Sequence, residues 1–186
     1  MRAVIRGVVQ GVGFRPAVHR IASEMRLNGF VQNNGSEVIV EVDGDIEELV
    51  RRLRAGLPPL ARIDSVQIED SAPAGAEGFS IVGSESGRRG VSIPNDVALC
   101  DACRKELFDP GNRRHLYPFT NCTDCDARFT VIEDLPYDRG NTSMAEFEMC
   151  EDCRREYADP ANRRFHHQTI SCPRCGPRYY LLDAEG

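Results

Sequence analysis

The chain has 186 residues, a length that fits one large domain or two small ones. Hydrophobic residues make up 41% and charged residues 28%, and the net charge of −6 disfavours broad attraction to nucleic acid or anionic lipid. No apolar run reaches the length of a membrane span, and no signal peptide precedes the first predicted strand. We therefore expect a cytoplasmic protein with neither a membrane nor a nucleic-acid partner.

A glycine-rich loop follows the first predicted strand, which covers residues 3–9. Gly11 and Gly13 allow the backbone to turn and to come close to a ligand. Arg15 and Pro16 follow, and Pro16 suits the first position of a helix. A helix N-terminus offers free N–H groups to an anion, and the planar fork of Arg15 fits phosphate oxygens. We interpret this segment as a phosphate cradle made of Gln10, Gly11, Val12, Gly13, Phe14 and Arg15.

Two common nucleotide-binding patterns do not fit this loop. No Gly-Lys-Ser/Thr follows it, and Pro16 stands where the dinucleotide pattern requires a glycine. Short glycine motifs also arise by chance. The alternative to a phosphate cradle is therefore an ordinary strand-to-helix turn that carries one solvated arginine.

Two amphipathic helices are predicted in the first half of the chain. The first follows the loop and stops at Asn28-Gly29, because glycine favours a helix end. The second begins with a capping box of Asp45 and Glu48 and stops at Gly56. The apolar faces consist of Val18, Ile21, Ala22 and Met25 in the first helix and of Ile46, Leu49, Val50 and Leu53 in the second.

Alternating or continuous apolar residues predict five strands, at 3–9, 30–33, 37–42, 63–69 and 79–82. Asn34-Gly35 is typical of a tight hairpin turn between the second and third strands. The element order indicates an α+β, ferredoxin-like (βαββαβ) domain. Residues 83–90 are rich in Gly, Ser and Arg and are interpreted as a linker. We expect one domain at 1–88 and a second at 89–186.

The second half carries all 8 cysteines, as four Cys-x-x-Cys pairs. With no signal peptide, this pattern favours metal ligands over disulfides, and the regular pairing disfavours redox chemistry. Two structural zinc ions are therefore predicted. The local pairing joins the first four cysteines at one ion and the last four at the other, and an interleaved pairing stays possible. The predicted ligands are Cys100, Cys103, Cys122, Cys125, Cys150, Cys153, Cys172 and Cys175.

The cysteine segments form an internal repeat with an offset of 50 residues, at about 97–133 and 147–183. Asp-Pro-x-Asn-Arg-Arg recurs at 109–114 and 159–164. The arginines either form a basic patch or, as the acidic composition favours, pair with nearby carboxylates that include the Asp-Pro acids. Three histidines lie between the cysteine pairs and are interpreted as surface residues or supports of the ligands: His115, His166 and His167.

The first domain resembles acylphosphatase. The resemblance rests on the loop from Gly7 to Arg15, on Gly29-x-Val31-x-Asn33 and on the element order. It implies hydrolysis of acyl phosphates, with Arg15 and the loop amides holding the phosphate and Asn33 positioning the attacking water. An anchored anion with a good leaving group requires no protein base for this reaction.

The whole chain resembles the N-terminal part of the HypF-type carbamoyltransferases of [NiFe]-hydrogenase maturation. The resemblance rests on the acylphosphatase motif and on both cysteine repeats. It also rests on three further segments: Pro58-Pro59-Leu60-Ala61-Arg62-Ile63, Pro118-Phe119-Thr120-Asn121-Cys122 and Pro136-Tyr137-Asp138-Arg139. It implies a reaction of carbamoyl phosphate and ATP that delivers a carbamoyl group to the partner HypE and forms the cyanide ligands of the metal site. The domains that use ATP and transfer the group lie beyond Gly186 in that family.

One departure from the family concerns Asp126-Ala127, where Gly-Pro is common, and we expect it to affect the local turn rather than the ligands. The sequence therefore predicts an acylphosphatase-type hydrolase acting on carbamoyl phosphate, joined to a two-zinc module. The alternative is a non-catalytic, zinc-binding protein-interaction module. The presence of both Arg15 and Asn33 favours the enzyme.

Overall fold

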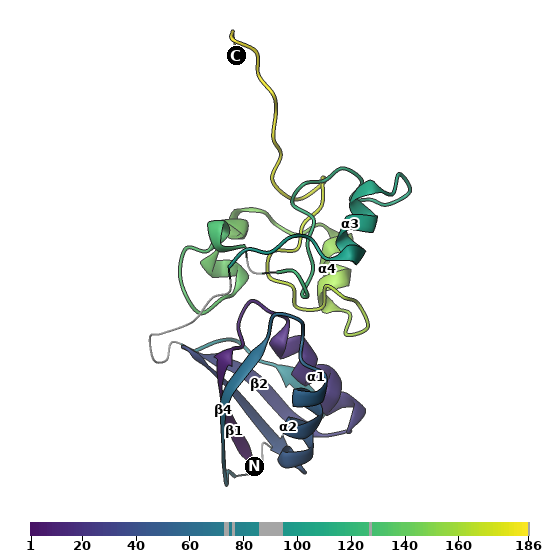
Figure 1. Cartoon of the computed structure of the whole chain (residues 1–186). Helices are drawn as coiled ribbons and strands as arrows, with labels where there is room; N and C mark the ends of the chain where they lie inside the picture. The colour runs from purple at the N-terminus through teal and green to yellow at the C-terminus, as the bar shows by residue number, and fades with distance from the viewer. Residues whose placement is uncertain (73–74, 76, 86–94, 127, 186) are drawn as a thin grey trace.

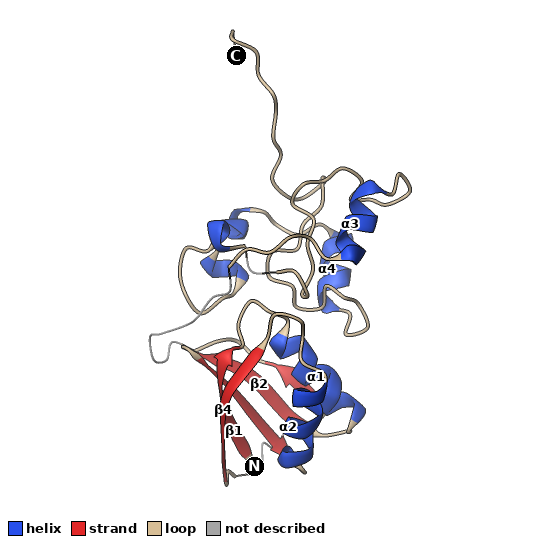
Figure 2. Ribbon diagram, viewed as in Figure 1, coloured by secondary structure: helices blue, strands red, loops and turns tan. Residues whose placement is uncertain are grey.

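A computed structural model describes residues 1–72, 75, 77–85, 95–126 and 128–185. One part is a sheet covered by helices, and the other is a cysteine-rich part with little regular structure (Figures 1 and 2). We call them the first and second domains. The predicted linker at 83–90 and the predicted boundary at residue 88 lie largely outside the described residues.

The first domain contains a five-stranded sheet of order β4-β1-β3-β2-β5. The pairs β1–β3, β1–β4 and β2–β3 are antiparallel, and the short β5 pairs in parallel with β2. This arrangement confirms the ferredoxin-like prediction and adds β5 at one edge. The strands are β1 Arg2–Val8, β2 Asn28–Asn34, β3 Glu37–Asp43, β4 Arg62–Glu69 and β5 Phe79–Ile81.

Two helices, α1 (Phe14–Glu24) and α2 (Ile46–Ala55), cover one face of this sheet (Figure 2). Asp45 caps α2, since its side chain accepts a hydrogen bond from the Glu48 N–H at 2.9 Å. The predicted apolar faces are buried except for Met25, which is half-buried. Together with Val38, Val40 and Val42 of β3, these faces form the core of the domain.

Three local features lie a few residues away from their predicted positions: the start of α1, the end of α1 and the hairpin turn. Helix α1 begins two residues before Pro16, which occupies its first turn, where an N–H has no helical partner in any case. It ends at Glu24 rather than at Asn28, and Arg26 adopts a left-handed φ of 55° instead of the expected glycine. Residues 35–36 form the hairpin turn, because Asn34 is still paired with Glu37.

The second domain has no strand longer than an isolated bridge among its described residues. Its helices are α3 Asp101–Phe108 and α4 Glu151–Ala158, with the 3₁₀ turns η1 Phe129–Val131, η2 Arg139–Asn141 and η3 Ser143–Glu146. The apolar clusters in the two repeats are small, and each includes all four cysteines of its repeat. This domain therefore has little apolar core apart from its cysteines.

Candidate phosphate site and cysteine clusters

The glycine loop lies at the end of the sheet that faces the second domain (Figure 1). Gly11 and Gly13 have φ of 67° and 71°, in the left-handed region that suits glycine. A Cβ at Gly13 would lie 3.0 Å from the Thr123 carbonyl oxygen, so the second domain packs directly on the loop. The N–H groups of Gly11, Val12, Gly13 and Phe14 donate no hydrogen bond to any described residue. They are available to an anion.

The guanidinium of Arg15 points into the boundary between the domains. Its Nη2 donates to the Asp138 carboxylate at 2.7 Å and to the Tyr137 carbonyl at 3.2 Å, and its Nη1 donates to the Ser84 hydroxyl at 3.2 Å. The Arg15 side chain is 11% exposed. The cation assigned to phosphate is therefore held by a carboxylate of the second domain.

A small cavity of about 20 Å³ lies over the loop. It holds about one water molecule, and a phosphate needs the covering residues to move. Of the predicted cradle residues only Val12 does not line it. The second domain contributes the cover, which consists of Thr123, Asp126, Tyr137, His166 and Gln168.

Gln10, predicted to contact the phosphate, and Asn33, predicted to position the attacking water, are both buried. The Gln10 side chain donates to the Gly35 carbonyl at 2.6 Å and accepts from the Tyr137 N–H at 3.3 Å, so it joins the hairpin turn to the second domain. Asn33 is 1% exposed and does not line the cavity. Its buried Oδ1 has no hydrogen-bond partner among the described residues.

His166 borders the same cavity. Burial and the neighbouring Arg15 guanidinium lower the pKa of His166 to about 4, so its ring is neutral at pH 7. Its φ of 51° matches the 53° of Leu116, which occupies the equivalent place in the first repeat. A left-handed turn therefore recurs in both repeats and presents an imidazole to the cradle in only one.

Asp126 takes part in a buried polar network rather than in a local turn. Its Oδ1 accepts from the Tyr137 and Thr169 hydroxyls, each at 2.9 Å, and its Oδ2 lies 3.1 Å from Nδ1 of His167 without the alignment of a hydrogen bond. Burial and the Asp126 carboxylate raise the pKa of the Tyr137 phenol, which stays protonated. His167 Nε2 lies 2.8 Å from the Asn121 Oδ1.

The second repeat shows why Asp126 fits. The equivalent residue there is Gly176, and a Cβ on it would lie 2.1 Å from the Tyr117 hydroxyl. Tyr117 is equivalent to His167, whose shorter ring leaves room for a carboxylate at position 126. Gly176 of the second repeat therefore faces the large Tyr117 of the first, whereas Asp126 of the first repeat faces the smaller His167 of the second.

Each repeat brings four cysteines together, as the local pairing predicts. The Sγ atoms within each set of four lie within 4.8 Å of one another, and none of the 8 cysteines is in a disulfide. The Cys100–Cys122 and Cys103–Cys125 Sγ atoms are each 3.7 Å apart. A tetrahedral ion with Zn–S bonds of about 2.3 Å gives sulfur separations of about 3.8 Å. Both clusters therefore fit a tetrahedral zinc ion.

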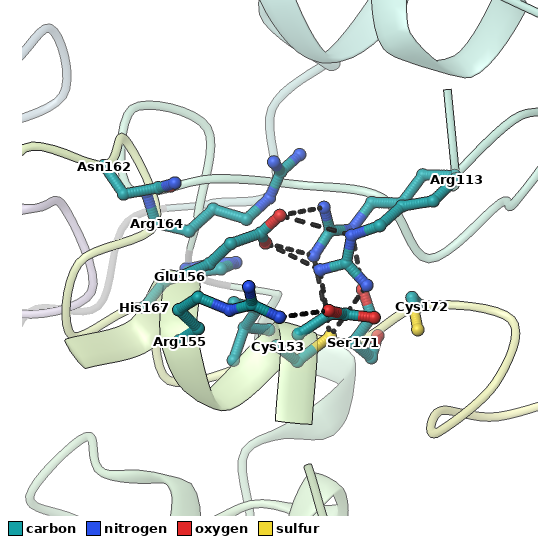
Figure 3. Close-up of polar contacts among 12 residues, drawn as sticks. Arg113, Cys153, Arg155, Glu156, Asn162, Arg164, His167, Ser171 and Cys172 are labelled. Atoms are coloured by element: carbon teal, nitrogen blue, oxygen red, sulfur yellow. Dashed lines mark hydrogen bonds and ion pairs between the residues drawn. The ribbon is translucent and has the colours of Figure 1, made fainter. Parts of the chain in front are cut away.

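The repeated arginines cross between the repeats. Around Glu156 of α4, Arg113 of the first repeat lies 2.8 Å from the carboxylate (Figure 3). Arg114 of the same repeat lies 2.6 Å from it. Burial alone would raise the pKa of Glu156, but hydrogen bonds from these arginines lower it to about 2. Glu106 pairs likewise with Arg163 and Arg164 of the second repeat.

Pairing of the arginines with carboxylates was correctly predicted, but not with the Asp-Pro acids. Asp109 and Asp159 accept hydrogen bonds from backbone N–H groups two residues onward. Sequence reasoning missed Glu106 and Glu156, although each lies three residues after a cysteine, at the same position of its repeat. It also missed Asp138, for which no local signal marked a contact with Arg15.

Comparisons with known proteins find relatives for both domains. The acylphosphatase family profile matches residues 1–81, and the HypF finger profile matches residues 99–132 and 149–182. A crystal structure of full-length HypF in its phosphate- and nucleotide-bound form matches 99% of the chain, with a TM-score of 0.90 and 44% identity. The first domain belongs to the acylphosphatase family, and the chain as a whole corresponds to the N-terminal part of HypF.

The HypF carbamoyltransferase of Rhizobium leguminosarum bv. viciae is 51% identical over 146 residues, which are 78% of this chain and 19% of the relative. The chain therefore spans about a fifth of the length of the HypF relatives it matches. An acylphosphatase of Thermotoga petrophila is 38% identical over 80 residues, 41% of this chain and 89% of the relative. No helix among the described residues is long and apolar enough to cross a membrane.

Proposed function

We propose that the first domain hydrolyses acyl phosphates at the phosphate cradle, Gln10–Arg15. The observation that carries this proposal is the meeting of unpaired N–H groups at the start of α1 with the Arg15 guanidinium at one cavity. Such donors stabilise the charge that develops on a transferred phosphoryl group. A full-length HypF relative was crystallised in a phosphate-bound form, which agrees with an anion site in this family.

The reaction requires little from the protein beyond positioning. A water molecule attacks the phosphorus, the P–O bond to the acyl group breaks, and that oxygen leaves as a carboxylate or carbamate. Because the leaving group is a weak base, no general acid is required. Asn33 does not line the closed cavity, so it can reach this water only after the cover has moved. Its buried Oδ1, which lacks a partner among the described residues, then accepts a hydrogen bond from the water and directs a lone pair of the water oxygen toward the phosphorus.

In the HypF setting we propose carbamoyl phosphate as the substrate. The first domain then takes part in the ATP-dependent transfer of a carbamoyl group to HypE. This carbamoyl group is the source of the cyanide ligands of the [NiFe] site. The parts that use ATP and complete the transfer belong to the rest of the longer relatives, of which this chain spans about a fifth.

We propose two structural Zn²⁺ ions, one bound by Cys100, Cys103, Cys122 and Cys125 and the other by Cys150, Cys153, Cys172 and Cys175. Four thiolates at tetrahedral spacing leave no open position for a substrate. We also propose a first domain at 1–88 and a second at 89–186. The metals then hold together the domain that covers the cradle.

Phosphate release from carbamoyl phosphate and acetyl phosphate tests the hydrolase, with p-nitrophenyl phosphate as a substrate that lacks an acyl group. We expect release from both acyl phosphates by the wild-type chain and none above background by Arg15→Ala. The alternative, a non-catalytic interaction module, is favoured by the small size of the cavity and by the Arg15–Asp138 ion pair. Equal release by the wild type and Arg15→Ala would support that alternative.

A further inference from the structure

The repeated arginines contact the cysteine sulfurs of the opposite repeat. Arg113 of the first repeat places Nη2 and Nη1 at 3.3 and 3.5 Å from the Cys153 Sγ. Arg163 of the second repeat places Nη2 at 3.1 Å from the Cys103 Sγ. These contacts are reciprocal under the 50-residue offset of the repeat. Each repeat therefore supplies a cation to the ligand set of the other.

The second arginine of each pair fixes the geometry. Arg114 is 2% exposed, donates from Nε to the Ser171 carbonyl at 2.8 Å, and is bound by Glu156. Arg164 does the same with the Asn121 carbonyl at 3.0 Å and with Glu106. A buried guanidinium that loses its partners is costly. Each arginine pair can therefore take this position only when the opposite repeat is folded.

The charge of the clusters explains the use of arginine. A zinc ion with four thiolate ligands has a net charge of −2, and N–H donors directed at the sulfurs stabilise that charge. An arginine of one repeat therefore strengthens metal binding by the other repeat. It does so only while the repeat that supplies the arginine is folded. Since the apolar cluster of each repeat consists largely of its cysteines, that fold depends on its own metal.

We propose that the two metal sites load cooperatively, with Arg113 and Arg163 acting as positioning residues for the ion bound by the opposite repeat. The inference rests on the proposal that both cysteine clusters bind zinc. Binding at one cluster folds the segment that supports the other, and thermodynamic linkage makes the effect equal in both directions. The second domain then has two stable states, metal-free and doubly loaded.

Native mass spectrometry of the metal-free chain, titrated with Zn²⁺, tests this on the wild-type protein. At one equivalent, two independent and equal sites leave about half of the molecules with a single ion. We expect the singly loaded form to be a minor species beside the metal-free and doubly loaded forms. A statistical distribution would overturn the cooperativity. No zinc binding at all would instead overturn the proposed zinc sites.

Variants locate the coupling. Cys150→Ser with Cys153→Ser disables the second site, and competition with a chromophoric chelator then measures the affinity of the first. We expect this affinity to fall by about tenfold or more relative to the first site in the wild type. An unchanged affinity would overturn the proposal.

In an otherwise wild-type chain, Arg163→Ala should weaken the first site by about tenfold, whereas in the disabled chain it should add little. Arg155→Ala is the matched control, because Arg155 lies on α4, is exposed and pairs only with Asp152 among the described residues. It should leave both affinities unchanged. Losses from Arg163→Ala that are the same in both backgrounds would show that the arginine acts without the opposite metal.

Discussion

Arg15 and Asp138 form an ion pair with a separation of 2.7 Å across 123 residues of sequence. Arg15 belongs to the glycine loop of the first domain, and Asp138 immediately precedes η2 in the second. The pair has side-chain exposures of 11% and 29%, so solvent screens it only in part. A phosphate that enters the cradle meets a carboxylate already bound to the cation it requires.

Replacing Asp138 by asparagine should therefore tighten the binding of inorganic phosphate, by about tenfold. The change removes a negative charge that competes for Arg15 and repels the anion. Isothermal titration calorimetry measures the effect. Glu133→Gln is the control, since it removes one charge from an exposed residue of the same segment. Weaker phosphate binding in Asp138→Asn would show that the carboxylate orients Arg15 rather than competing with the anion.

Arg15→Ala should abolish acyl phosphate hydrolysis, and Arg15→Lys should restore little of it. A lysine supplies a point charge, whereas the planar fork donates two hydrogen bonds in fixed directions. Steady-state phosphate release measures both variants. Arg20→Ala, an exposed arginine of α1, serves as the control and should retain wild-type activity. If Arg15→Lys kept most of the activity, the assignment of the cradle would be wrong.

Asn33→Ala should lower turnover far more than it weakens the binding of inorganic phosphate. A group that contacts only the attacking water acts on the chemical step and not on the bound ground state. Turnover from carbamoyl phosphate and the dissociation constant of phosphate give the two quantities. Because Asn33 is buried, thermal unfolding should be recorded for the same variant. Equal losses in turnover and in affinity would mean that Asn33 supports the fold or the anion site.

Removal of the metals should unfold the chain from about Cys100 onward and leave the first domain folded. The first domain has a continuous apolar core of two helices and a sheet, whereas the clusters of the second domain consist largely of cysteines. Amide hydrogen exchange after chelation should show protection lost only in the second half. Protection that persisted there without zinc would contradict the structural role of the metals.

The same chelation separates folding from function. Loss of the second domain removes the cover over the cradle and releases Arg15 from Asp138. Hydrolysis should therefore continue in the metal-free protein. If hydrolysis stopped on chelation while the first domain kept its amide protection, the cover would have to supply part of the catalytic site.

Acidification should destabilise the protein partly through His166. The pKa of this residue is about 4 in the folded chain and about 6.5 when unfolded, so between these values the unfolded state binds the extra proton. The contribution of a neutral His166 is therefore complete above about pH 6.5 and is lost as the pH falls toward 4. Denaturant unfolding at pH 7 and pH 5 measures it.

His166→Leu is the suitable comparison, since Leu116 adopts the same left-handed backbone in the first repeat. The variant should lose less stability than the wild type between pH 7 and pH 5. Protonation of the cysteine ligands affects both proteins equally and cancels in the difference. An identical loss in the two proteins would show that His166 does not titrate in this range.

Local signals in the sequence were sufficient for most of the elements and for the grouping of the cysteines into two sets of four. The capping box at Asp45, the alternation from Val38 to Val42 and the spacing of the Cys-x-x-Cys pairs each act over a few residues. Their outcome therefore depends little on the rest of the chain. The end of α1 at Glu24 was mispredicted, because Arg26 takes up the left-handed position after the helix where the sequence pattern favours glycine.

The tertiary structure alone decided which partners the charged residues take. Nothing in the Asn-Arg-Arg repeat indicates that Arg113 and Arg163 reach the cysteines of opposite repeats, and nothing near Asp138 indicates Arg15. Long charged side chains bind whatever opposite charge the packing of distant segments brings within reach. A local pattern can therefore specify the residue types of a site, whereas the partner of each charge follows from how the two repeats and the two domains pack together.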